Sequence, residues 1–105
     1  MKAMRIIELD ATQWKSIPDF YNALLAAIGA PAWHGKNPNA LVDSMIWGGI
    51  NAVEPPYTIK ITGSAALPKD VHDQIEAAKQ DLAKGRIDYH DRCGGDVDVS
   101  IETVS

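Results

Sequence analysis

The sequence contains one cysteine, Cys93, and no long apolar run. A single cysteine excludes an internal disulfide, which is typical of proteins from reducing compartments. No stretch approaches the roughly 18 consecutive apolar residues of a membrane span, and residues 1–8 lack the apolar segment of a signal peptide. We therefore expect a cytoplasmic protein that does not bind membranes.

Basic residues are also scarce relative to acidic ones. The chain has 10 lysines and arginines against 14 aspartates and glutamates, for a formal net charge of −4. Nucleic acids and anionic membranes are bound through basic patches, so neither is expected as a partner, whereas a basic protein fits this charge. The phosphate-binding patterns GxGxxG and GxxxxGK[ST] are both missing, and we expect no cofactor.

The chain does have ordered apolar spacing over its 105 residues, of which 46% are hydrophobic. This suffices for one modest core, so we expect a single domain over residues 1–105. Apolar residues alternate in the predicted strands and recur every three or four positions in the predicted helices. The strands are predicted at residues 4–9, 57–62 and 97–102. The helices begin after Ser16, after Asn37 and at Pro68, and they end before Gly29, Gly48 and Gly85.

The order strand, helix, helix, strand, helix, strand predicts an α/β fold, with a small parallel sheet and helical crossovers. Strict alternation in the last two strands indicates that only one face of the sheet is well covered. Residues 86–95 fit two descriptions. Ile87 and Tyr89 alternate with polar residues, and Gly94-Gly95 would turn a hairpin into the last strand, but a plain loop fits equally well.

The second predicted helix stands out because both of its faces carry apolar residues. Asn37 is a good N-cap and Pro38 suits the first helical position. Leu41 and Met45 share a core-facing side. The opposite side carries three residues spaced four apart, which are Asn39, Asp43 and Trp47, and Ile46 lies beside this stripe. A stripe that combines an acid with a tryptophan is a candidate contact surface.

The segment from Pro31 to Asp43 resembles the barstar family of ribonuclease inhibitors and immunity proteins. It has the family's aromatic–aromatic–Gly–x–Asn–x–x–Ala–Leu–x–Asp pattern, and Ser16–Asp19, Pro56–Ile59 and the closing β-branched strand follow the family order. The resemblance implies a barstar-like fold, with a three-stranded parallel sheet packed with three to four helices. It also implies a basic ribonuclease or ribonuclease toxin as partner, bound one to one.

By this resemblance, the second helix and its preceding loop block the enzyme's active site, and Asp43 enters the phosphate-binding site. Asn39 stands where the family has a second aspartate, and Val42 where it has a tryptophan. Aligning by Gly85 places Gln80 at the family's late-helix acid. With Ile46 and Trp47 added from the exposed stripe, the candidate partner-binding residues are Trp33, His34, Gly35, Asn37, Asn39, Val42, Asp43, Ile46 and Trp47.

Two other hypotheses compete with an inhibitor. The same helix would also serve an interaction module whose partner is not a nuclease. A small metal-dependent hydrolase would be built on Asp88, His90, Asp91 and Cys93, although their spacing matches no strong zinc pattern. We favour the inhibitor, and expect no catalysis and no bound metal.

Overall fold

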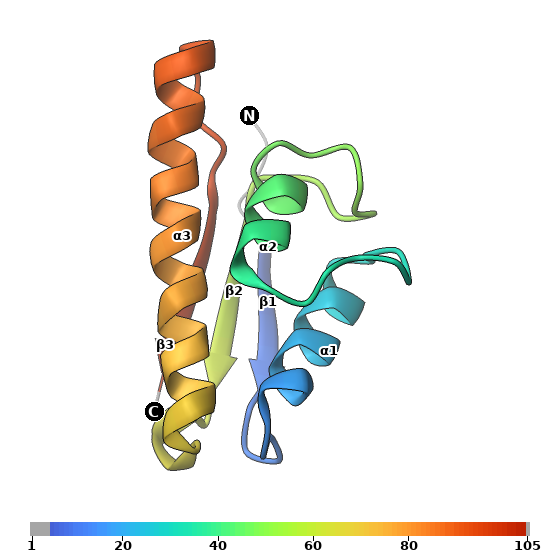
Figure 1. The fold of residues 1–105 in the computed structure, drawn as a ribbon, viewed down its shortest axis with the longest axis vertical. Coiled ribbons are helices and arrows are strands. Elements are labelled where there is room, and N and C mark those ends of the chain that lie inside the picture. The colour runs from blue at the N-terminus through green and yellow to red at the C-terminus, as the bar shows by residue number, and fades with distance from the viewer. Residues whose placement is uncertain (1–4, 105) are drawn as a thin grey trace.

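The computed structural model describes residues 5–104 as a three-stranded sheet with helices packed against it (Figure 1). Met4, the predicted start of the first strand, lies outside the described residues. Within them the elements are β1 (Arg5–Asp10), α1 (Ile17–Ala27), α2 (Pro38–Met45), β2 (Tyr57–Thr62), the 3₁₀ helix η1 (Ser64–Ala66), α3 (Lys69–Cys93) and β3 (Val99–Val104).

The sheet has the order β1-β2-β3 and both pairings are parallel. Tyr57 at the start of β2 is in register with Arg5 on one side and Val99 on the other. This confirms the predicted α/β fold with a small parallel sheet. The helices supply the crossover connections that parallel neighbours require.

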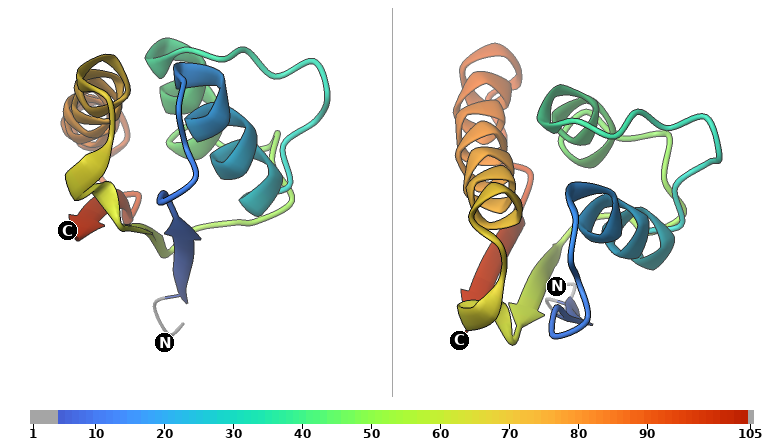
Figure 2. Two further views of the ribbon diagram at one scale, coloured as in Figure 1. Left: turned by 90° about the horizontal axis from the view of Figure 1, so that it is seen from below. Right: turned by 60° about the horizontal axis from the view of Figure 1, so that its bottom comes forward.

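All three α-helices lie on the same side of the sheet (Figure 2). Alternate β2 residues, among them Ile59 and Ile61, point toward the helices and are fully buried, while Thr58 and Lys60 between them are half-buried. On the uncovered face of β1, Ile6 is 62% exposed. The sheet is therefore well covered on one face only, as the alternation predicted.

Helix α1 begins where Ser16 and Asp19 predicted. The Asp19 carboxylate accepts hydrogen bonds from the backbone N–H groups of Lys15, at 2.8 Å, and Ser16, at 3.2 Å. The bond from Lys15 is the main reason that the pKa of Asp19 lies below its usual value. The apolar side of α1 joins the core through Phe20, Leu24 and Leu25.

Helix α3 differs most from the prediction, because it passes through Gly85 and continues to Cys93. The predicted stop at Gly85 and the hairpin or loop over residues 86–95 are therefore wrong. The helix ends at Gly94, which has the left-handed φ of 78° and donates its backbone N–H to the His90 carbonyl at 2.8 Å. Strand β3 accordingly begins at Val99, two residues later than predicted.

Gly85 serves close packing rather than helix termination. It is buried against α2, and a Cβ built on it would lie 2.8 Å from Val42 Cγ1 and 3.3 Å from Ile46 Cγ1. Its backbone does not need the left-handed region, in contrast to that of Gly94. The glycine lets α2 and α3 approach each other more closely than any other residue would allow.

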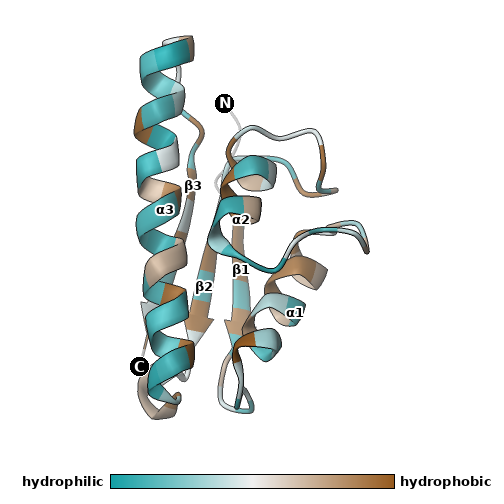
Figure 3. Ribbon diagram, viewed as in Figure 1, coloured by the Kyte–Doolittle hydropathy of each residue, from teal (hydrophilic) through white to brown (hydrophobic). Residues whose placement is uncertain are grey.

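The solvent-facing side of α3 is hydrophilic along most of its length (Figure 3). Its exposed charges form i,i+4 ion pairs, such as Lys69 with Asp73 and Asp88 with Arg92. Among residues 5–104, no helix is long and apolar enough to cross a membrane.

Candidate protein-binding face

Helix α2 has the start that the sequence predicted. The Asn37 side-chain Oδ1 accepts a hydrogen bond from the Ala40 backbone N–H at 2.9 Å, and Pro38 follows it. The last helical residue is Met45, with Ile46 as the C-cap. The chain then turns at Gly48 and Gly49, which have φ of 76° and 79°.

Most of the circumference of α2 is buried. Leu41, Met45 and Ile46 are at most 2% exposed, and Ser44 is 3% exposed. At 100° per residue, these side chains cover an arc of roughly 200°. The exposed strip that remains is narrow, and it consists of Asn39, Asp43 and Trp47.

Ile46 does not belong to this strip, although it was predicted as a partner contact. It is 2% exposed and faces Gly85 on α3. Val42, also predicted as a contact, is half-buried and lies against the same glycine. The reason is that α3 packs along this flank of α2, so both residues form the seam between the helices. We remove Ile46 from the candidate contacts.

Asp43 has the environment that an intermolecular contact needs. Its side chain is exposed, and within residues 5–104 it makes no hydrogen bond or ion pair. Several other acids on the surface are paired, as Glu8 is with Lys60 and Asp73 with Lys69. The carboxylate of Asp43 is therefore exposed to solvent on a capped helix, without a counter-ion in the part of the chain that the structure describes.

The loop before α2 carries two consecutive aromatic side chains, one exposed to solvent and the other buried. Trp33 is 74% exposed, whereas His34 is only 7% exposed. The His34 ring lies 2.6 Å from Ser44 Oγ through Nε2 and 2.7 Å from the Gly35 carbonyl oxygen through Nδ1. His34 was predicted to contact a partner directly, but its ring is turned into the protein because it binds α2. We remove it from the direct contacts.

Gly35 and Asn37 have local roles at the start of α2. A Cβ on Gly35 would lie 3.1 Å from Ala40 Cβ and 3.2 Å from Asn37 Nδ2, so a side chain would crowd the first turn. Asn37 is exposed but uses its Oδ1 as the helix cap. Both residues remain at the surface, where a partner can approach them.

Tyr89 is a candidate contact that sequence reasoning missed. Its ring centroid lies 5.1 Å from that of Trp47, which is itself 42% exposed. The pair joins α3 to the end of the α2 strip. Tyr89 follows Leu82 by seven residues on the buried side of α3, and this spacing was the available signal. It was overlooked because the helix was predicted to end at Gly85.

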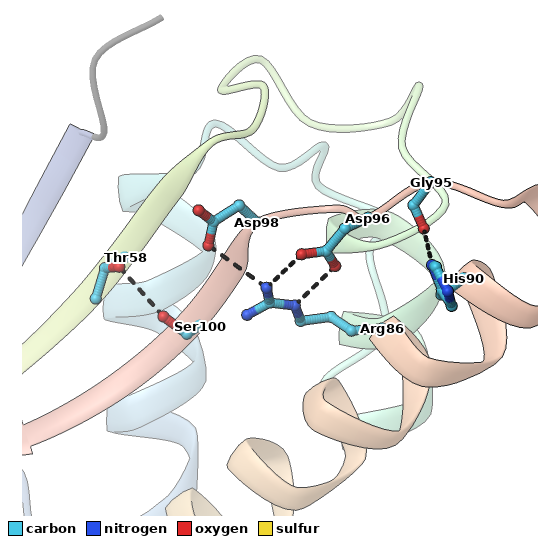
Figure 4. A network of polar contacts seen from close by, with 7 residues as sticks. All are labelled: Thr58, Arg86, His90, Gly95, Asp96, Asp98 and Ser100. Carbon is cyan, nitrogen blue, oxygen red and sulfur yellow. Dashed lines mark hydrogen bonds and ion pairs between the residues drawn. The ribbon is translucent and has the colours of Figure 1, made fainter.

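A charged network fixes the last turns of α3 to the connection that leads into β3 (Figure 4). Arg86 donates to both carboxylate oxygens of Asp96, at 3.2 and 2.7 Å, and lies 3.7 Å from Asp98. His90 is hydrogen-bonded to the Gly95 carbonyl oxygen at 3.2 Å. The bond to Arg86 holds the pKa of Asp96 below its usual value. These acids are therefore neutralised locally, unlike Asp43.

The residues proposed for a metal-dependent hydrolase do not form a site. Asp88, His90, Asp91 and Cys93 all lie on the last turns of α3, where they point in different directions around the axis. In the part of the chain that the structure describes, no three His, Cys, Asp or Glu side chains are placed to hold a metal ion.

The family comparison agrees with this geometry. The family model described as Barstar (barnase inhibitor) matches residues 4–94, which is most of the chain. A search of the curated proteins found no match. The matched region contains β1, α1, α2, β2, η1 and all of α3. The fold and the match together place this chain in the barstar family.

Proposed function

We propose that this protein inhibits a ribonuclease or a ribonuclease toxin by placing α2 and the loop over residues 31–36 in the active site of the enzyme. The family description, barnase inhibitor, supports the class of partner. The observation that carries the proposal is the exposed Asp43 carboxylate on α2, which has no partner among residues 5–104.

The chemistry of a ribonuclease active site favours such a group. Arginine, lysine and histidine side chains hold the phosphate of the substrate, and a carboxylate on a rigid helix accepts the same charge-assisted hydrogen bonds. The net charge of −4 also attracts a basic enzyme over distance and speeds encounter. Asp43 is thus proposed to occupy the place of a substrate phosphate.

The residues around Asp43 would complete the interface. Trp33 precedes α2 and Trp47 follows it, and exposed tryptophans are frequent anchors of protein–protein contacts. Asn39 contributes a neutral polar group one turn before Asp43. Tyr89 extends the surface onto α3 beside Trp47. In this function the protein binds one enzyme molecule in the cytoplasm and performs no catalysis.

A titration tests the proposal directly. Increasing amounts of the protein are added to barnase, and to any ribonuclease encoded beside this gene, while RNA cleavage is measured. We expect activity to fall linearly to zero at one equivalent. Binding without inhibition would instead favour an interaction module with another kind of partner.

The role of Asp43 is tested by Asp43→Asn with Asp91→Asn as its control. Asp91 is also exposed and unpaired within residues 5–104, but it lies on α3 nearly opposite Tyr89. Both variants change the net charge equally. Loss of one partner of a buried interfacial charge pair costs about 2–5 kcal/mol, or roughly 30- to 4,000-fold in Kd, a scale that comes from other complexes, with barnase–barstar itself among them.

We expect Asp43→Asn to weaken binding by that factor and Asp91→Asn to weaken it less than about threefold. Circular dichroism and thermal unfolding check that both variants remain folded. If Asp43→Asn weakened binding less than about tenfold, or no more than Asp91→Asn, Asp43 would not be the anchor.

A further inference from the structure

The loop that carries Trp33 is attached to α2 by a single buried side chain. Within the described part of the chain, three hydrogen bonds hold residues 31–36, and all three involve His34. Its backbone N–H donates to the Pro31 carbonyl oxygen at 3.0 Å, and its ring bonds Gly35 O at 2.7 Å and Ser44 Oγ at 2.6 Å. His34 is therefore the centre of the loop's internal bonding.

The partners of the ring fix its tautomer. The Gly35 carbonyl oxygen only accepts hydrogen bonds, so Nδ1 carries the proton and donates it. In the neutral ring Nε2 then accepts from the Ser44 hydroxyl. Ser44 Oγ also lies 3.4 Å from the Leu41 carbonyl oxygen. The distance to Nε2 is much shorter, so the hydroxyl donates its hydrogen bond to Nε2. Both ring nitrogens are satisfied in this way.

We infer that the His34–Ser44 hydrogen bond is a latch that positions Trp33 for partner binding. The ring and the hydroxyl are 7% and 3% exposed, while the adjacent Trp33 is 74% exposed. One residue thus turns inward and binds α2, and its neighbour is held outward. A loop that is ordered before binding loses less conformational entropy in the complex. His34 is a positioning residue here, and this inference rests on the proposed function.

The latch is tested first in the free protein, by amide hydrogen exchange of Ser44→Ala. Removal of the hydroxyl leaves Nε2 without its partner and removes the side-chain hydrogen bond between the loop and α2. We expect the backbone amide of His34, which is the hydrogen-bonded amide of this loop within the described residues, to exchange at least tenfold faster, while the amides of β2 and α3 are unchanged. The matched control is Ser64→Ala, because Ser64 is a similarly buried serine whose hydroxyl bonds the Val104 carbonyl oxygen, far from this loop.

The second test is a double-mutant cycle on the affinity for the ribonuclease inhibited by the wild-type protein. We expect Ser44→Ala alone to weaken binding about tenfold, but less than about twofold when Trp33→Ala is already present. Combined with Asp43→Asn, it should still weaken binding about tenfold. A role limited to overall stability would give the same effect in both backgrounds.

Several results would overturn the latch. The first is an unchanged exchange rate of the His34 amide in Ser44→Ala, and the second is equal acceleration across the whole protein. The third is an effect on affinity that does not depend on Trp33. If the wild-type protein bound no ribonuclease, the proposed function would fail. The exchange experiment would still decide whether the His34–Ser44 bond holds the loop.

Discussion

Gly85→Ala tests the close approach of α2 and α3. In an isolated helix the substitution is stabilising by about 1 kcal/mol, because alanine is a better helix former than glycine. Here the new Cβ would lie 2.8 Å from Val42 Cγ1, about 0.6 Å closer than the 3.4 Å at which ordinary contacts begin. Val42 is β-branched and half-buried, so its side chain cannot rotate freely to make room.

The balance of these effects predicts a less stable protein. Overpacking of this kind costs about 1–3 kcal/mol, which exceeds the gain in helix propensity. We expect Gly85→Ala to lower the free energy of unfolding by about 1 kcal/mol. In a Val42→Ala background, the Cγ1 atom is gone, and the same substitution should instead raise stability by up to about 1 kcal/mol. Ile46 Cγ1, at 3.3 Å, requires only a small adjustment.

Urea unfolding followed by circular dichroism measures these free energies for both single variants, the double variant and the wild type. The m values must agree, so that differences in midpoint report stability alone. The sign change between the two backgrounds is the essential result. A stabilising Gly85→Ala in the wild-type background would show that α2 and α3 are not in tight contact at this position.

Two further predictions concern titrating groups. The Tyr57 hydroxyl is buried without a hydrogen-bond partner among the described residues, and burial raises its pKa. Tyr57→Phe should therefore leave the free energy of unfolding at pH 7 unchanged or raise it by up to about 1 kcal/mol. The variant should also lose less stability than the wild type above pH 10, which urea unfolding at both pH values would show. A drop of more than about 1 kcal/mol at pH 7 would argue against an unpaired hydroxyl. The pKa of Asp19 lies below its ordinary value of 3.8, so its capping contribution is present above that pH and is lost as the pH falls through the folded-state pKa. Asp19→Ala should lower the melting temperature at pH 7, and the difference from the wild type should shrink below pH 3.8; a difference independent of pH would contradict this origin.

The parts of the fold that local chemistry determines were predictable from the sequence. Asn37 and Pro38 mark the start of α2 because the cap and the fixed φ act within a single turn. The alternation of Tyr57, Ile59 and Ile61 identifies β2, and the order of elements gives the parallel sheet. The exposed positions of Asn39, Asp43 and Trp47 also follow from helical spacing.

The errors have one physical origin, which is contact between elements distant in the sequence. A glycine that ends a helix and a glycine that allows two helices to touch look the same in a sequence, and Gly85 was assigned to the wrong class. The extension of α3 beyond Gly85 places Tyr89 against Trp47, and the close packing of α2 on Gly85 itself buries Ile46. His34 is buried because Ser44, ten residues away, offers its hydroxyl at the right distance. No local pattern contains that information.

The length of α3 has a consequence for how this face can diverge. Its 25 residues span roughly 37 Å, whereas a six-residue strand covers about 20 Å. Figure 1 shows the last turns rising above the sheet, beside the connection to β3. Whole turns can be gained or lost in that overhang without disturbing the strands below. Each added or lost turn would shift the C-terminal end of α3 by about 5.4 Å. The surface beside Trp47 could thereby evolve to fit a differently shaped enzyme.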